Sequence, residues 1–168
     1  NRIGQSNWQT FGLVADGLFQ SQEEIDAWPT QKFGEVKPGD IRYIDINGDG
    51  VVDDYDKKPI GFPDVPEISY GFGASVRWKG FDVSIFFQGI DNVNFFINNS
   101  YTQPFIANKT RHSNVFADLY DNYWTEDNRD AKYPRLTIGS NTNNNQASTF
   151  WMVDGRYIRL KNAEIGYT

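Results

Sequence analysis

The clearest pattern in the chain is a strict alternation of apolar residues with small or polar ones over residues 67–78. The apolar positions are Ile68, Tyr70, Phe72, Ala74, Val76 and Trp78, and the positions between them are Ser69, Gly71, Gly73, Ser75 and Arg77. A period of two predicts a β-strand with one apolar face. This run is about twice the usual strand length of five or six residues, which suits a tilted membrane crossing.

A second alternating run follows directly after Lys79 and Gly80. Its apolar positions are Phe81, Val83, Ile85 and Phe87, with Phe86 as the one exception. Two long runs joined by two residues predict a β-hairpin whose register is fixed by the turn. Trp78 and Phe81 flank the turn, where a membrane barrel has its aromatic girdle. The pattern therefore favours a membrane hairpin over residues 67–89, with a soluble β-sandwich as the alternative.

The stretch 150–168 also has strand character. Ile158 and Leu160 alternate with polar or aromatic neighbours, and the apolar positions then shift to Ala163, Ile165 and Tyr167. A shift of one residue predicts a β-bulge near Asn162. Three or four strands cannot close a barrel, so we expect the chain to be a fragment whose last strand, in 148–168, is truncated.

The remaining chain predicts one strand, one short helix and long loops. Residues 8–18 indicate a strand followed by a turn. Ser21 and Glu24 form a capping box, in which each side chain accepts from the backbone N–H of the other, and the box predicts a helix over Gln22–Ala27 that ends before Pro29. We expect residues 1–66 to form this strand and an external loop that contains the helix, and residues 90–147 to form a long external loop, because long loops between strands are typical of membrane barrels.

Composition supports an all-β fold. Hydrophobic residues make up 39% of the chain and aromatic residues alone 16%, with 15 glycines; this balance favours strands and turns over packed helices. No apolar run approaches the roughly 18 residues of a membrane helix, which does not argue against a barrel. The net charge of −6 and the lack of a basic cluster exclude nucleic acid as an expected partner.

Enzymatic chemistry has little support in the sequence. The chain has no cysteine, and His112, its only histidine, lies in a polar stretch where we expect a plain loop residue. Glu126 and Asp127 could form the acidic pair of a glycosidase. Adjacent residues in a polar loop do not by themselves place two carboxyl groups across a substrate, so we expect no enzyme.

Residues 45–56 match the twelve-residue calcium loop at nearly every position. The expected ligands are the side chains of Asp45, Asn47, Asp49 and Asp53, the backbone carbonyl of Val51, and Asp56. Gly50 permits the sharp turn and Val52 supplies the apolar anchor. Asp56 stands where the pattern has glutamate, which predicts weaker binding. We expect a structural Ca²⁺ ion, with an Asx-rich turn that binds no ion as the alternative.

Several blocks along the chain resemble one family, in consistent order. They are VADGLFQSQEEI (14–25), GDIRY (39–43), KGFDVS (79–84), FQG (87–89), YWT (123–125), YPR (133–135), DGRYIRLKN (154–162) and GYT (166–168). Together they resemble the SusC/RagA family of TonB-dependent outer-membrane transporters. The resemblance implies a 22-stranded barrel with an internal plug in the outer membrane of a Gram-negative bacterium, of which this chain is an incomplete part.

The same resemblance implies partners and a function. Family members import glycans, peptides or other nutrients with energy supplied through TonB, and a SusD-like lipoprotein covers the barrel. It also makes Lys79-Gly80 a periplasmic turn. The alternative function is a soluble, calcium-dependent carbohydrate-binding module that uses Trp8, Trp28, Trp124 or Trp151 as stacking platforms. The two differ in where Phe72 lies, because lipid contacts it in a barrel and a core buries it in a module.

Overall fold

The computed structural model describes residues 3–98, 102, 104–105 and 115–168, so His112 lies outside the described residues. The chain divides into two compact units. Unit 1 comprises Asn1–Thr10, Gly61–Phe95 and Val153–Thr168, and unit 2 comprises Phe11–Ile60 and Phe96–Met152. Within the described residues, no helix is both long and apolar enough to cross a membrane.

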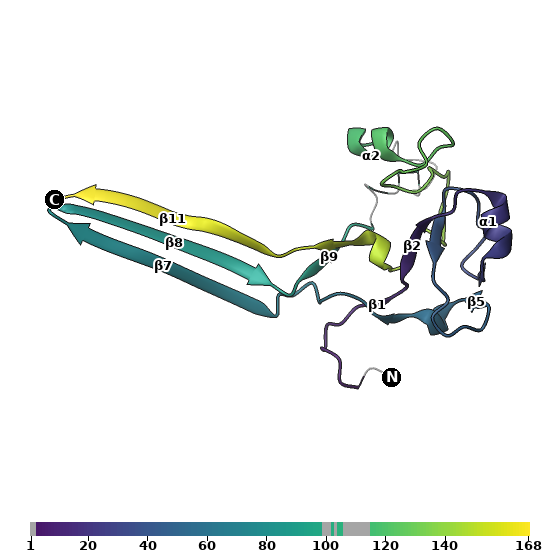
Figure 1. Ribbon diagram of the computed structural model, residues 1–168, viewed down its shortest axis with the longest axis horizontal. Helices are drawn as coiled ribbons and strands as arrows, with labels where there is room; N and C mark the ends of the chain where they lie inside the picture. The colour runs from purple at the N-terminus through teal and green to yellow at the C-terminus, as the bar shows by residue number, and fades with distance from the viewer. Residues whose placement is uncertain (1–2, 99–101, 103, 106–114) are drawn as a thin grey trace. The chain divides into compact units, whose positions relative to one another are not determined.

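Unit 1 is built on three long strands, β7 (Ile68–Trp78), β8 (Phe81–Asp91) and β11 (Tyr157–Tyr167). Each has 11 residues. β8 lies in the middle and pairs antiparallel with β7 on one side and with β11 on the other (Figure 1). The two alternating runs and the last strand therefore form one sheet, as the pattern predicts.

The turn between β7 and β8 has the conformation that a two-residue hairpin requires. Lys79 and Gly80 both have positive φ, 49° and 85°, which is typical of a type I′ turn and matches the twist of the strands that it joins. The backbone N–H of Thr168 donates to the carbonyl of Gly80 at 2.8 Å. The turn thus also holds the end of β11.

The predicted bulge is present in β11. Leu160 lies opposite Phe87 and Asn162 opposite Phe86, so Lys161 has no partner in the register. The extra residue returns Ala163, Ile165 and Tyr167 to the face that Ile158 and Leu160 occupy. The shift in the sequence pattern is therefore the means by which β11 keeps one apolar face.

Two further short strands, β9 (Asn94–Phe96) and β10 (Met152–Asp154), pair with each other. Asn94 is buried, and its side chain links β9 by hydrogen bonds to the segment around Phe62 and to β10. Its side-chain Oδ1 accepts from the N–H of Phe62 at 2.6 Å, and its Nδ2 donates to the carbonyl of Val153 at 3.3 Å. Both partners belong to unit 1.

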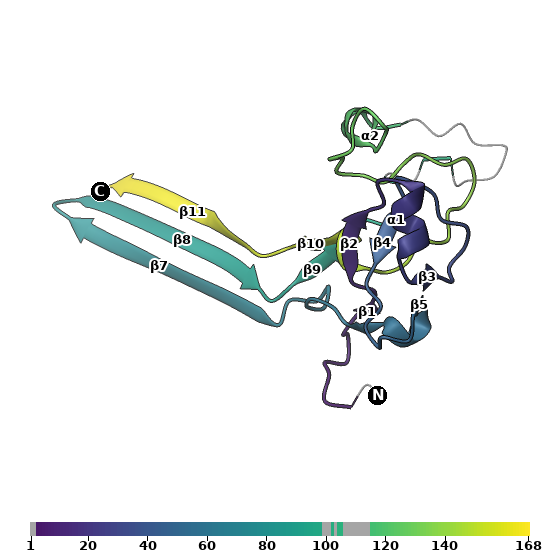
Figure 2. The same ribbon diagram turned by 45° about the vertical axis from the view of Figure 1, so that its right-hand side comes forward.

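Unit 2 contains many short elements, shown from a second direction in Figure 2. Its strand pairs are β1 (Phe11–Gly12) with β6 (Lys58–Pro59), β2 (Ala15–Leu18) with β4 (Ile41–Tyr43), and β3 (Thr30–Gln31) with β5 (Val51–Val52). Its helices are α1 (Gln22–Ala27), α2 (Ala117–Asn122), and the 3-10 turns η1 (Asp54–Asp56) and η2 (Thr149–Trp151).

The core of unit 2 shows that parts of the stretches 1–66 and 90–147, which we expect to contain external loops, pack around a hydrophobic interior. Its buried residues are Leu13, Leu18, Ile41, Tyr43, Val52, Leu119, Trp124, Tyr133 and Trp151. Each comes from an element or turn too short to show periodicity in the sequence, so the pattern indicated only loop. Trp151 and Tyr43 are completely buried, and burial raises the pKa of the Tyr43 hydroxyl.

Helix α1 has the bounds that the capping box predicts, with one change of partner. The Ser21 hydroxyl accepts from the N–H of Glu24 at 3.3 Å. The Glu24 carboxylate instead accepts from the N–H of Gln20 at 2.6 Å and pairs with Arg42. The predicted bond to the N–H of Ser21 was therefore wrong: one oxygen of the carboxylate accepts from the N–H one residue earlier, and the other pairs with Arg42 on β4.

Unit 2 also contains a buried polar cluster around Asp40, which is 0% exposed. Its carboxylate forms an ion pair with the Arg135 guanidinium, accepts from Nη2 of that residue at 3.1 Å, and accepts from the Nδ2 atoms of Asn141 and Asn144, each at 2.9 Å. The N–H of Lys37 donates to the same carboxylate at 2.8 Å. This cluster replaces water around a buried charge. It also explains why part of the asparagine-rich stretch, expected in an external loop, is buried.

Candidate functional site

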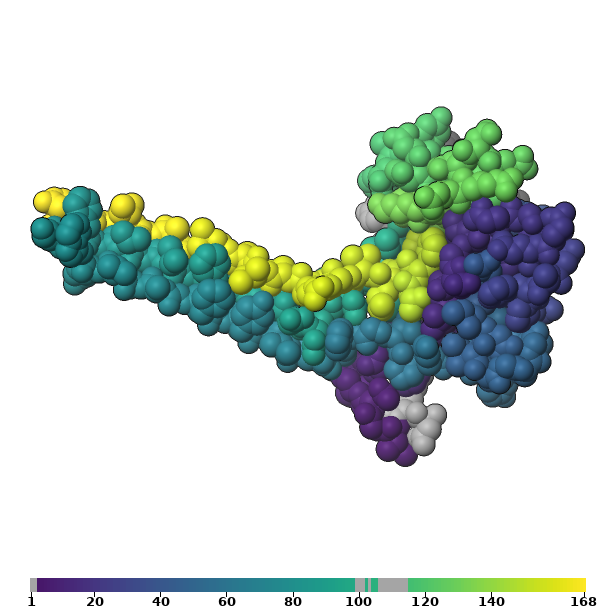
Figure 3. Space-filling view, in the orientation of Figure 1, coloured from purple at the N-terminus to yellow at the C-terminus, as the bar shows by residue number. Residues whose placement is uncertain are grey.

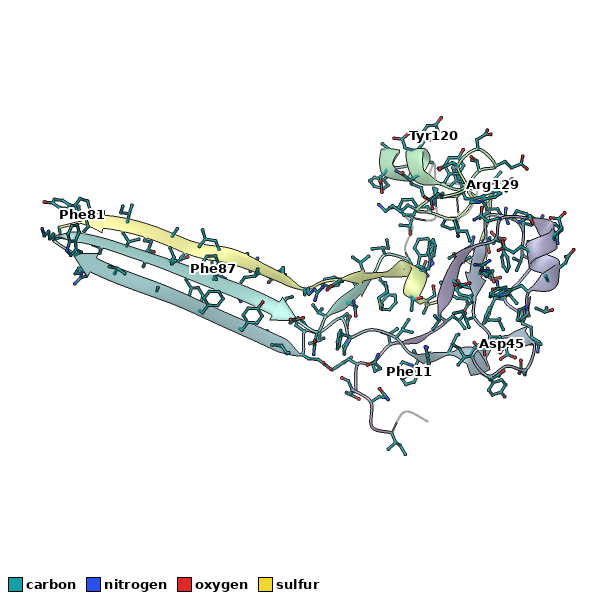
Figure 4. The ribbon with its side chains drawn as sticks, viewed as in Figure 1. Phe11, Asp45, Phe81, Phe87, Tyr120 and Arg129 are labelled. Atoms are coloured by element: carbon teal, nitrogen blue, oxygen red, sulfur yellow. The ribbon has the colours of Figure 1, made fainter. Side chains whose placement is uncertain are left out.

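One face of the sheet in unit 1 is apolar across all three strands. The register places Trp78 opposite Phe81, and Phe81 opposite Tyr167. The rings of Phe81 and Tyr167 are 4.7 Å apart, and Nζ of Lys79 lies 4.9 Å from the centroid of the Trp78 ring. Phe81 is labelled at the turn end of the sheet in Figure 4. A row of three aromatic rings with a lysine is the arrangement expected at a membrane–water interface.

Beyond this aromatic row, the same face continues with aliphatic and aromatic side chains. They are Tyr70, Phe72, Ala74, Val76, Val83, Ile85, Phe87, Ile158, Leu160, Ala163 and Ile165. Most of these large side chains are exposed, among them Phe72 at 53%, Val76 at 66% and Ile165 at 78%. In the space-filling view the three strands form one layer, and no other segment of unit 1 covers the visible face (Figure 3).

An exposed apolar surface of this extent marks an interaction site. The carbohydrate-binding alternative requires Phe72 to lie in a core, and in the described residues it does not. Its ring instead stacks on that of Phe87, which lies opposite on β8, with 5.3 Å between the centroids. The exposure of this face therefore goes against the soluble alternative.

The opposite face of the sheet is polar. Arg77 lies opposite Asp82 in the register. The Ser84 hydroxyl donates to Oε2 of Glu164 at 3.4 Å, and Nζ of Lys161 donates to Oε1 of Gln88 at 3.0 Å. Polar side chains bonded across strands suit contact with water, so the two faces of the sheet favour different solvents.

Phe86, the exception to the alternation, lies on the polar face over two glycines. A Cβ atom added to Gly71 would come within 2.7 Å of Cζ of Phe86, and one added to Gly73 within 3.0 Å of its Cδ2. The ring therefore packs over the backbone of the two glycines, which have no side chain of their own to cover it. Sequence reasoning missed this role. The signal was an aromatic residue out of phase, opposite glycines at alternate positions of the paired strand.

In the acidic loop of unit 2, each predicted ligand side chain is bonded within the loop or nearby. Asp45, labelled in Figure 4, accepts from the N–H groups of Gly48 at 2.7 Å and Gly50 at 2.8 Å. Asn47 Oδ1 accepts from the N–H of Asp49 at 2.8 Å, and Asp49 Oδ1 accepts from the N–H of Val51 at 2.9 Å. These bonds fold the first half of the loop into successive Asx turns.

The second half of the loop is closed by Asp56, which is 1% exposed. Burial raises the pKa of this carboxyl group, but backbone N–H donors outweigh burial and bring the pKa below its usual value. The donors are the N–H groups of Asp53 at 2.8 Å, Ile46 at 2.8 Å and Asn47 at 3.2 Å. Asp53 caps η1 by accepting from the N–H of Tyr55 at 2.9 Å.

Two features of the loop fit a cation site and one does not. Val52, the predicted anchor, is fully buried. The N–H groups of Thr30 and Lys32 on or next to β3 donate to the carbonyls of Gly50 and Val52. Because carbonyls point to alternate sides along a strand, the carbonyl of Val51 points away from β3. However, no three His, Cys, Asp or Glu side chains in the described part of the chain are arranged to hold a metal. Calcium binding by Asp45, Asn47, Asp49, Val51, Asp53 and Asp56 stays a prediction.

The other candidate residues do not form a common site. Trp124 and Trp151 are 8% and 0% exposed in the core of unit 2, so they cannot be the stacking platforms of the carbohydrate-binding alternative. Trp8 is 64% exposed in unit 1, whereas Trp28 is half-buried in unit 2. Glu126 and Asp127 are both exposed.

Comparison with known proteins places these features in a family. TonB-dependent receptor P3 of Formosa agariphila is 30% identical over 166 residues, 99% of this chain and 15% of the relative. TonB-dependent receptor P26 of the same organism is 30% identical over 168 residues, 98% of this chain and 16% of the relative. This chain therefore spans about 15% of the length of these curated relatives. No family model matches the chain.

Solved structures show the same fold. The structure of the RagAB peptide transporter matches with a TM-score of 0.62 at 20% identity, over 95% of this chain and 16% of that one. The RagAB peptide importer in its open-open state matches with a TM-score of 0.57 at 18% identity, over 98% of this chain and 16% of that one. The all-β prediction, with a barrel incomplete in this chain, is confirmed.

Proposed function

Because this chain belongs to the TonB-dependent receptors, with SusC/RagA-type transporters as its structural neighbours, we propose that it forms barrel wall and external loops of an outer-membrane nutrient importer. Its place is the outer membrane of a Gram-negative bacterium. Unit 1 contributes three wall strands, and unit 2 contributes loop structure. The relatives are named as receptors, and we propose no enzymatic activity for this chain.

One observation carries this proposal: the exposed apolar face of three 11-residue strands in continuous register. An apolar face is more stable in contact with lipid than in contact with water. Closure of the barrel pairs the backbone N–H and C=O groups at the two edges of the sheet. The polar face, with Arg77, Asp82 and Glu164, then borders the barrel interior. The Lys79-Gly80 turn lies at the periplasmic end.

The finer features of the importer are part of the same proposal. We propose that the complete receptor works with a SusD-like surface lipoprotein and takes energy through TonB. Its substrates are glycans or peptides. The fold shared with a protein described as a peptide transporter supports peptides.

The test places a charge on each face of one strand in the complete receptor. Phe72→Arg puts a cation on the lipid side of β7, where near the membrane centre it costs about 2–4 kcal/mol. Ser75→Arg is the matched control, because it puts the same side chain on the opposite face of the same strand. We expect Phe72→Arg to lower the amount of folded receptor in the outer membrane and Ser75→Arg to leave it nearly unchanged. Equal assembly of the two variants would contradict the proposal.

For the loop 45–56 we further propose a structural Ca²⁺ ion. A carboxylate has about four lone-pair sites, so N–H bonds to Asp45 and Asp49 leave capacity for a cation. Five carboxylates in twelve residues also repel each other without one. Calorimetric titration of the complete receptor with Ca²⁺, with Asp45→Asn as the control, is expected to show heat that the variant reduces. No heat and no change in melting would contradict calcium binding.

A further inference from the structure

A pocket of about 410 Å³ lies beside α1 in unit 2. Its apolar walls are Phe19, Ile25, Trp28, Pro29 and Val36, and Asp26 is its one charged lining residue. All of these residues belong to unit 2. The volume is near the lower end of the range of about 300–1,000 Å³ that small-molecule sites occupy, so it suits one or two side chains of a ligand.

The aromatic wall of the pocket is held in place by the surrounding fold. The indole N–H of Trp28 donates to the carbonyl of Tyr43 at 2.8 Å. The Arg42 guanidinium lies 4.6 Å from the centroid of the Trp28 ring, and Phe19 meets this ring edge-on at 6.4 Å. Arg42 does not line the pocket, so its charge lies outside the lining. A wall fixed in this way is formed before a ligand binds.

Gln31 lines the pocket without offering its amide to a ligand. Its Nε2 donates to the Ile41 carbonyl at 3.1 Å and to Asn143 Oδ1 at 2.7 Å, and its Oε1 accepts from the N–H of Tyr43 at 2.6 Å. A sugar needs several free hydrogen-bonding groups beside an aromatic ring. With the amide of Gln31 occupied, the hydroxyl of Thr30 is the one uncharged polar side-chain group of the lining left for a sugar, so the apolar walls favour a ligand with an apolar stem.

The charge around the pocket favours a cation at the end of that stem. Unit 2 contains 16 acidic and 10 basic residues, and unit 1 contains six of each, so unit 2 holds all of the net charge of −6. Helix α1 has Glu23 and Glu24 in its first turn and no basic residue in its last. Asp26 accepts from Gln22 Nε2 at 2.8 Å. None of the ion pairs found among the described residues includes Asp26.

From the rigid aromatic wall, the aliphatic lining and the single carboxylate, we propose that this pocket binds an arginine or lysine side chain of a peptide. The methylene stem packs on Ile25, Pro29 and Val36, as long basic side chains do on apolar surfaces. The cationic end pairs with Asp26 and lies against the Trp28 ring. This inference gives the proposed importer a substrate class, basic peptides, and so rests on the proposed function.

The test is calorimetry on the complete receptor in detergent. The probes are the tripeptide Gly-Arg-Gly with blocked ends, its citrulline analogue, which keeps the shape and removes the charge, and maltotriose. We expect the arginine peptide to bind about tenfold more tightly than the citrulline peptide, as a charge-assisted bond implies. Maltotriose is expected not to bind in the pocket.

Two variants of α1 localise the effect. Asp26→Asn removes the charge from the pocket and is expected to abolish the preference for arginine over citrulline. Glu23→Gln is the matched control, since it removes the same charge from the same helix at a residue that does not line the pocket. It is expected to keep that preference. Both residues are exposed, so neither change disturbs the core.

Each other outcome overturns the inference. Equal affinity for the two peptides, no binding, tighter binding of maltotriose, or equal effects of Asp26→Asn and Glu23→Gln would each do so. The assay measures binding and not uptake. A receptor that binds the arginine peptide at Asp26 and imports nothing would refute the proposed import alone, and a receptor that imports nutrients without this binding would refute the pocket alone.

Discussion

The sheet of unit 1 and the core of unit 2 place the same kinds of side chain in opposite surroundings. Trp78 is 66% exposed on the apolar face of the sheet, whereas Trp151 is 0% exposed in the core of unit 2. Polar groups differ in the same way. Arg77 and Asp82 lie on an open face, and Asp40 is enclosed by Arg135 and two asparagines.

This difference shows that the chain itself buries the apolar side chains of unit 2 and leaves those on one face of the unit 1 sheet exposed. Unit 2 stabilises itself by packing its apolar residues together and by pairing its buried polar groups. The sheet of unit 1 leaves a whole face for an apolar surrounding that the chain does not provide. A mutation in unit 2 should therefore act through folding, and a mutation on the sheet through insertion into lipid.

The largest expected effect comes from removing the buried tryptophan. Trp151→Ala deletes the indole of a fully buried side chain together with its hydrogen bond, at 2.7 Å, to the carbonyl of Asn144. We expect a loss of about 3–5 kcal/mol, typical of large aromatic residues in cores. Amide hydrogen exchange of unit 2 in the complete receptor measures it. Trp78→Ala is the control and should leave exchange in unit 2 unchanged; equal loss from both would remove the distinction between the units.

A smaller effect is expected from the ring that covers two glycines on the polar face. Phe86→Ala should destabilise the barrel by roughly 1–2 kcal/mol, less than the 3–5 of a core phenylalanine because Phe86 is 41% exposed. Thermal unfolding of the complete receptor checks the value. Gly71→Ala should also destabilise it, through a clash with the ring.

A double-mutant cycle sharpens this prediction. With Phe86 already replaced by alanine, the nearest of the atoms that crowd a side chain at position 71 is gone, so Gly71→Ala should cost less than it does in the presence of the ring. Strictly additive costs would show that the ring and the glycine do not interact.

The smallest effect is the response of unit 2 to acid. The pKa of Asp56 in the folded chain lies below its usual value of about 3.8. A depressed pKa stabilises the fold at pH values above the usual one, and this contribution is lost as the pH falls through the folded pKa. The protection factors of the amides in the loop 45–56, which take account of the pH dependence of free amide exchange, should therefore fall below about pH 4.

Asp56→Asn is the control for this response. It removes the titrating group, so it should flatten the fall of the protection factors in acid. An unchanged pH profile in the variant would mean that another group controls the loop.

The sequence was sufficient to predict those parts that depend on long patterns or local signals. The hairpin of β7 and β8 follows from a period of two that runs through both strands, and the bulge at Lys161 from a single shift in that period. Helix α1 follows from its capping residue and from Pro29. In each case the information lies within one continuous stretch of the sequence.

The rest depends on contacts between residues far apart in the chain. Unit 2 has strands of two to four residues, such as β3 and β5, which are too short to show periodicity. The burial of Asn143 and Asn144 depends on hydrogen-bond partners about 100 positions earlier, Ile41 and Asp40. Without knowledge of these partners, a run of polar residues predicts a surface loop. The pocket beside α1 likewise needs β3 and the turn after it.

The most direct test of the central claim is a scan of β7 with single spin labels in the complete receptor. The 168 residues contain no cysteine, so none in this stretch would take up label in addition to the introduced one. Labels at positions 72, 74 and 76 should collide with oxygen dissolved in lipid, and labels at 71, 73 and 75 with a water-soluble nickel complex. Accessibilities that alternate with a period of two in this phase are the predicted result. Equal accessibility at all six positions, or the opposite phase, would contradict the membrane assignment.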